Sequence, residues 1–164
     1  MKRLLLFWLA LSLLSCTGCA QRQATASQVL DALVRAEIGL PAGQSYLSAA
    51  PEDDPAYLPP ALMSTLYGQG EPPWQLALIE DYGIWLSTAG HPCEFAVFFC
   101  YARSDTDEVA AMCRARLDDL CAFYQNTQYA AYLQNAKVAI SGKCVLLLIS
   151  SDPEHALRTA TGAI

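Results

Sequence analysis

Two closely spaced pairs of side chains carry most of the chemistry that the sequence offers. The first is Cys16-Thr17-Gly18-Cys19, which has the spacing of a thiol redox motif. A redox pair of this kind follows a strand and opens a helix of a thioredoxin-like unit, whereas this one ends an apolar amino-terminal run. A cysteine preceded by small residues at that place is typical of a lipobox. We therefore predict lipidation at Cys19, which follows Thr17-Gly18, with Cys16 as the alternative.

The second pair is His91 and Cys93, separated by Pro92. An imidazole within hydrogen-bond reach of a thiol can activate it as a nucleophile, so a small extracytoplasmic enzyme that uses this pair is the alternative function. The intervening proline holds the two groups apart, and zinc needs three or four well-placed ligands. Since the sequence has only two histidines, we expect no metal site, no cofactor and no catalytic residue.

The other chemically capable side chains favour structural roles. Adjacent carboxylates, such as Asp53-Asp54 and Glu80-Asp81, usually diverge instead of converging on a cleft. Cysteine often behaves as a small buried hydrophobe, which we expect of the five later cysteines. A cross-strand disulfide between Cys100 and Cys144 is the alternative for two of them. These five are Cys93, Cys100, Cys113, Cys121 and Cys144.

The amino-terminal residues predict export and anchoring. Lys2 and Arg3 precede an apolar run from Leu4 to Leu14, which is too short for a transmembrane helix and typical of a signal peptide. We predict a lipoprotein signal peptide over residues 1–18 and a tether over residues 19–26. The protein would then be held by lipid to the extracytoplasmic face of the cell membrane, in the cell envelope.

The charge of the chain limits the classes of partner that it is expected to bind. The formal net charge is −6, and removal of residues 1–18 takes away two basic residues and leaves eight basic against sixteen acidic ones, a net charge of −8. Nucleic-acid binding normally needs a basic stripe, and none is visible here. We therefore expect no nucleic-acid partner, and contact with the membrane only through the lipid anchor.

Residues 27–164 predict one α+β domain. Helical spacing of apolar residues begins at Ser27, and a short helix is expected over residues 60–67. Residues 77–87 and 94–102 predict one strand hairpin, and residues 136–141 and 143–150 predict another. Between them, Ser104 is expected to cap a long helix whose apolar stripe packs on the sheet. A terminal helix follows Pro153. The result is a roughly four-stranded, mainly antiparallel sheet, with residues 41–60 as a loop.

The order and spacing of several short motifs resemble exported bacterial lipoproteins. The motifs begin with Asp81-Tyr82 and the run from Glu94 to Phe98, and the rest are Tyr129, Asn135-Ala136-Lys137-Val138, Gly142, Val145 and Ser151-Asp152. In this pattern the chain is similar to the lipoproteins that share domain of unknown function 4358, over roughly residues 66–153. The resemblance implies the compartment and the fold but no activity. Our interpretation is a non-catalytic envelope lipoprotein that binds or scaffolds something, with an envelope protein as a possible partner.

Overall fold

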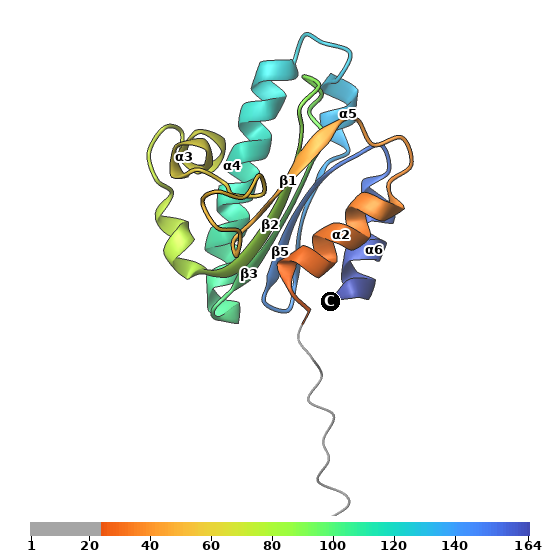
Figure 1. Cartoon of the computed structure of the whole chain (residues 1–164). Coiled ribbons are helices and arrows are strands. Elements are labelled where there is room, and N and C mark those ends of the chain that lie inside the picture. The colour runs from red at the N-terminus through yellow and green to blue at the C-terminus, as the bar shows by residue number, and fades with distance from the viewer. Residues whose placement is uncertain (1–23) are drawn as a thin grey trace, which may run out of the picture.

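A computed structural model describes residues 24–164 and shows an α+β fold (Figure 1). One antiparallel sheet of five strands lies between two layers of helices. The predicted signal peptide, the predicted lipidation sites Cys16 and Cys19, and most of the predicted tether lie outside the described residues.

The sheet has the strand order β1-β2-β3-β5-β4. The predicted hairpins are present as β2 (Ile79–Ser87) with β3 (Glu94–Cys100), and β4 (Lys137–Ser141) with β5 (Cys144–Ile149). The expectation of four strands is wrong, because β1 (Gly43–Leu47) pairs with β2 at one edge of the sheet. This strand lies within the stretch that was expected to be a loop. It is short and only half-buried, so its sequence has little of the alternation of apolar and polar residues that marks a strand.

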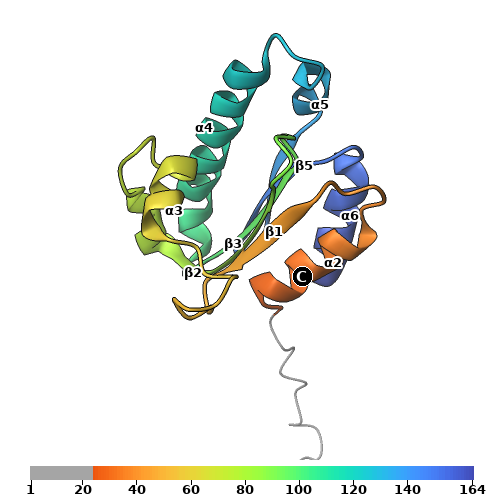
Figure 2. The ribbon, with the colours of Figure 1, turned by 45° about the horizontal axis from the view of Figure 1, so that its top comes forward.

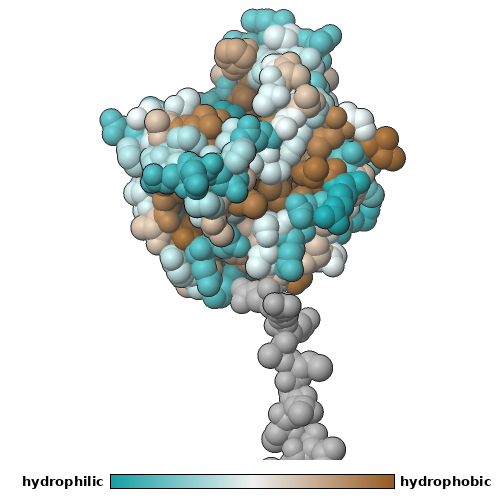
Figure 3. All heavy atoms as spheres, viewed as in Figure 1, coloured by the Kyte–Doolittle hydropathy of each residue, from teal (hydrophilic) through white to brown (hydrophobic). Residues whose placement is uncertain are grey.

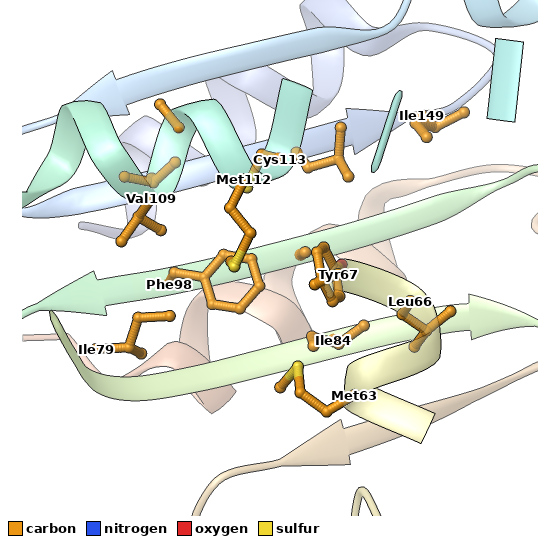
Figure 4. Close-up of a cluster of buried hydrophobic side chains, with 14 of the residues drawn as sticks. Met63, Leu66, Tyr67, Ile79, Ile84, Phe98, Val109, Met112, Cys113 and Ile149 are labelled. Carbon is orange, nitrogen blue, oxygen red and sulfur yellow. The ribbon is translucent and has the colours of Figure 1, made fainter. Parts of the chain in front are cut away.

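One face of the sheet is covered by α4 (Thr106–Tyr124), with α3 (Pro60–Tyr67) and α5 (Ala130–Gln134) beside it. The predicted apolar stripe of the long helix is confirmed: Val109, Met112 and Cys113 are buried against the sheet. Figure 4 shows these side chains meeting Phe98 and the α3 residue Tyr67 over the strands. Burial of this continuous apolar cluster is the main force that holds the layer in place.

The other face is covered by α2 (Ala26–Ala36) and α6 (Pro153–Ala163), which pack against each other. α2 approaches the sheet closely at Gly83 of β2, where an added Cβ would lie 3.1 Å from the Ala26 carbonyl oxygen. Between the two helix layers, every residue of β3 and β5 is buried. The continuously apolar sequence of β5 predicts this burial on both faces.

The helix boundaries differ from the predictions at two places. α2 begins at Ala26, and Thr25 closes a capping box with Gln28, so the helix starts one residue earlier than expected. The prediction that Ser104 caps the long helix is wrong. Residues Arg103–Asp105 form a 3₁₀ turn before α4, and the Ser104 hydroxyl donates a hydrogen bond to Asp105 (3.1 Å). The helix therefore begins two residues later, at Thr106.

A disulfide between Cys100 and Cys144 is not formed, and both residues are buried free thiols. Cys144 lies opposite Phe99, and successive strand residues point to opposite faces. Cys100 therefore packs under α4, while Cys144 packs on the side of α2 and α6. The sheet itself separates the two sulfur atoms.

The elements define two ends of the molecule (Figures 1 and 2). The beginning of α2 and the carboxyl-terminal end of α6 lie together at one end, which we call the proximal end. The β2–β3 turn, the last turns of α4 and all of α5 lie at the other, which we call the distal end. Most of the side chains of the candidate site come from elements that meet toward the distal end.

Candidate functional site

Glu94, the first residue of β3, is the most deeply buried charged side chain among the described residues, with 1% of its surface exposed. It accepts a hydrogen bond from the Tyr67 hydroxyl of α3 (2.6 Å). It also accepts two from the Arg116 guanidinium of α4, from Nε (3.1 Å) and Nη2 (2.8 Å). This carboxylate therefore joins the sheet to both helices above it. A buried charge of this kind is tolerated only when it is paired and hydrogen-bonded.

The network perturbs the ionisation of both donors. Burial, reinforced by the negative charge of Glu94, raises the pKa of the Tyr67 hydroxyl well above its usual value. Burial alone would lower the pKa of Arg116, but attraction to Glu94 outweighs this effect and raises it. Tyr67 therefore stays a neutral donor and Arg116 stays a cation over the physiological range.

The predicted pair of His91 and Cys93 lies in the β2–β3 turn, directly before Glu94. The His91 Nδ1 atom accepts a hydrogen bond from the backbone N–H of Cys93 (3.1 Å). Burial lowers the pKa of the imidazole, so its neutral form is favoured. With Nδ1 occupied as an acceptor, the neutral ring carries its proton on Nε2 and can only donate from there.

The Cys93 thiol is not activated in this geometry. Its side chain is buried, and burial raises its pKa to about 11, against a smaller opposing effect of a hydrogen bond with Tyr132. A nucleophilic cysteine needs the opposite shift, toward the thiolate at neutral pH. The structure thus brings His91 and Cys93 together, but through the cysteine backbone and not through its sulfur.

A row of aromatic rings in mutual contact extends from His91 at the distal end. The imidazole packs edge-to-face with Tyr129 (ring centroids 4.6 Å apart) and with Tyr132 (4.9 Å). Tyr129 contacts Tyr124 at 5.6 Å, and Tyr124 contacts Phe123 at 4.9 Å. Each of these pairs has the edge-to-face geometry that the ring quadrupoles favour.

A hollow of about 170 Å³ lies beside this row. Its wall includes His91 and Tyr124 from the row, and also Glu94 and Arg116 of the buried network. The Tyr124 hydroxyl donates a hydrogen bond to the Gly90 carbonyl oxygen (3.1 Å), which fixes the end of α4 to the β2–β3 turn. The hollow therefore joins the aromatic row to the charged pair, and we take the two together as the candidate site.

The sequence contains a signal for this network in the positions of its two charged residues. Arg116 follows Cys113 by three residues and precedes Leu120 by four, so it lies on the apolar stripe of α4. Glu94 likewise stands in an otherwise apolar strand. Opposite charges placed inside two apolar patterns indicate a buried ion pair, although their contact is visible only in three dimensions.

Two of the carboxylates that occur as adjacent pairs in the sequence have structural partners. Asp81 accepts a hydrogen bond from the first residue of α2, Ala26 (N–Oδ2, 2.8 Å), and another from the Ser48 hydroxyl. Asp54 accepts one from the Ala56 backbone (2.7 Å) within an exposed turn. Asp118 and Asp119 are exposed on α4. These side chains come from different parts of the fold, and no group of three or more metal-ligating residues occurs within residues 24–164.

Several residues that carry the lipoprotein resemblance connect elements in this fold. Besides Asp81, Glu94 and Tyr129, these include Lys137, which pairs with Glu154 across β4 and α6 (2.7 Å). Asp152 caps the start of α6 by accepting from the His155 backbone (2.9 Å). Motif residues of this kind maintain the fold, so their presence indicates an architecture more than an activity.

Comparisons with known proteins give no relatives. No protein-family model matches the chain, and neither do any curated proteins or solved structures. Within the described residues, no helix has both the length and the apolar character required to cross a bilayer.

Proposed function

We propose that the protein is a lipid-anchored lipoprotein on the extracytoplasmic face of the cell membrane, and that its domain is a non-catalytic binding or scaffolding module. The proposal includes membership of the lipoproteins with domain of unknown function 4358, and an envelope component as the partner. Anchoring is supported by the amino-terminal sequence alone, in which a basic start and a short apolar run precede Cys19.

The single observation that carries the non-catalytic part is the geometry of His91 and Cys93. The imidazole Nδ1 accepts a hydrogen bond from the Cys93 backbone N–H (3.1 Å), so the neutral ring carries its proton on Nε2 and has no free nitrogen to accept the thiol proton. The buried thiol has a pKa raised to about 11, which leaves almost no thiolate at neutral pH. This arrangement does not favour the alternative function, a small enzyme that uses His91 and Cys93.

The anchor is tested by fatty-acid labelling in cells that make the full chain. We expect Cys19→Ala to abolish labelling with palmitate and to release the protein from the membrane fraction. Cys16→Ala should change neither, because Cys16 has the bulky Leu14 close before it. A Cys121→Ala variant, altered in the domain, is the matched control. If Cys16→Ala alone abolishes labelling, Cys16 is the lipidated residue, and if labelling survives in the double variant the anchor proposal fails.

A further inference from the structure

The segment that runs from the last turn of α4 to the start of β4 has an unusual composition for this acidic protein. Residues 120–136 contain no charged side chain, although the chain has 26 acidic and basic residues in total. The segment holds three of the eight tyrosines together with several amides. Gln125, Asn126 and Gln128 lie in its exposed turn. An exposed surface in this protein is therefore neutral, aromatic and rich in groups that both donate and accept hydrogen bonds.

The turn is held in one conformation by local hydrogen bonds. The Thr127 hydroxyl donates to the Tyr124 carbonyl oxygen (2.8 Å) and accepts from the Tyr129 backbone (3.2 Å). These bonds set the two tyrosines on either side of the turn, where their rings contact each other. In Figure 3, teal and pale spheres predominate at this end of the molecule, as expected for a polar rather than an apolar surface.

Phe123 departs from that polar character. Its side chain is 77% exposed while its ring packs against Tyr124. A large apolar ring exposed to water loses the free energy of burial unless something covers it. Phe123 does not line the hollow itself, but its ring contacts Tyr124, which does.

The hollow supplies hydrogen-bond donors but little net charge. The Arg116 guanidinium has five N–H groups and directs two of them to Glu94, which leaves others free for a ligand. Its positive charge is balanced by the Glu94 carboxylate in contact with it. His91 also lines the hollow, and its neutral imidazole has an Nε2–H group that can donate a hydrogen bond. This pattern suits hydroxyl groups better than a phosphate or carboxylate, because an anion would be opposed by Glu94.

We propose that the aromatic row and the hollow bind a neutral carbohydrate. A sugar ring has an apolar face of C–H groups, which packs on the exposed ring of Phe123, and hydroxyl groups, which bond to the amides of the turn. One hydroxyl group enters the hollow beside Arg116. This inference rests on the proposed binding role and assigns the class of ligand that fulfils it. The distal position of the site would direct it away from an anchored membrane (Figure 1).

The test uses the full-length protein in a detergent without a sugar head group, titrated calorimetrically with maltotriose, cellotriose and chitotriose. We expect at least one trisaccharide to bind with a dissociation constant in the millimolar range or below. Phe123→Ala should weaken that binding about fivefold or more, because it removes an exposed packing surface and little of the fold. Trp74→Ala is the matched control, since Trp74 is an exposed aromatic residue (60%) outside this site, and it should bind like the unaltered protein.

Three results would overturn the inference. The first is that none of the trisaccharides binds at concentrations up to ~20 mM, which corresponds to no useful affinity. The second is that Phe123→Ala binds as tightly as the unaltered protein. The third is a photo-crosslinker at position 123 that captures only a protein in intact cells, which would identify a protein-docking surface. Cleavage of a bound trisaccharide would leave the ligand class standing and remove only the non-catalytic proposal.

Discussion

At the scale of single residues, the environment of a side chain decides its chemistry more than its type does. His91 and Cys93 are a reactive combination in sequence, yet the fold buries the thiol and turns the imidazole toward the backbone. Glu94 and Arg116 are far apart in sequence and form no common motif, yet they form the buried ion pair that lines the candidate site. The chemically informative residues are those whose charge conflicts with their burial.

The first prediction concerns the reactivity of the five domain cysteines. Four are buried, and only Cys121 is partly exposed. Because burial raises the pKa of Cys93 to about 11, we expect Cys121 to react first with iodoacetamide at pH 7.5 and Cys93 to react only on unfolding. Alkylation followed by mass spectrometry of the peptides measures each site. A fast reaction of Cys93 that disappears in His91→Ala would instead identify an activated nucleophile.

The second prediction concerns the buried ion pair. Removal of one partner leaves an uncompensated charge in the core, so Arg116→Met should lower the free energy of unfolding by about 3–5 kcal/mol. Combining it with Glu94→Gln removes both charges, and the double variant should lose less than the sum of the two single variants. Urea unfolding at neutral pH measures all three, with the exposed Arg114→Met as control. Strictly additive losses would mean that the pair contributes no coupling energy.

At the scale of elements, the helices and strands with clear periodicity could be predicted, and those without it could not. The short helix over residues 60–67 and the buried strand β5 follow from apolar spacing and from the flanking glycines and prolines. β1 could not be predicted, because Gly43–Leu47 becomes a strand only by pairing with β2. The contact between Glu94 and Arg116 likewise depends on how α4 lies across β3, which local sequence does not specify.

The third prediction tests the orientation of α4. Leu120 is 9% exposed and belongs to the core cluster beneath the helix, whereas Asp118 is exposed. Leu120→Ala should lower the free energy of unfolding by about 2 kcal/mol or more, because it leaves a cavity. Asp118→Ala should change it by no more than about 0.5 kcal/mol. Equal urea midpoints for the two variants would show that the helix faces the sheet differently.

At the scale of the whole molecule, the two helix layers bury thiols throughout the core. Burial raises the pKa of Cys100 to about 11 and that of Cys144 to about 12, and it also raises that of Cys113. A group whose pKa is raised by folding contributes its full stability below its unfolded pKa, which is about 8.5 for a thiol. That contribution is lost as the pH rises toward the folded value. The free energy of unfolding therefore decreases as the pH becomes alkaline.

The fourth prediction follows from this decrease. Under reducing conditions, the free energy of unfolding should fall steadily between pH 8.5 and 11, and each buried thiol should contribute a slope of about 1.4 kcal/mol per pH unit. Urea unfolding at several pH values gives the slope. Cys144→Ala should make it shallower, whereas Cys121→Ala, at the partly exposed site, should change it less. A stability that is flat across this range would contradict the burial of the thiols.

The meeting of both domain termini at the proximal end governs how the protein can be labelled. Ile164 lies beside the start of α2 (Figures 1 and 2), so on an anchored protein a reporter fused to the carboxyl terminus would be confined between the domain and the bilayer. An epitope inserted at Gly90, in the exposed β2–β3 turn, would project outward but would also obstruct the candidate site. The β4–β5 turn at Gly142 offers no alternative, because β5 begins opposite the last residues of β3, where Cys144 pairs with Phe99, and this turn therefore lies at the proximal end as well. Surface-display assays that use the carboxyl terminus would therefore report poor accessibility even for a correctly exported protein.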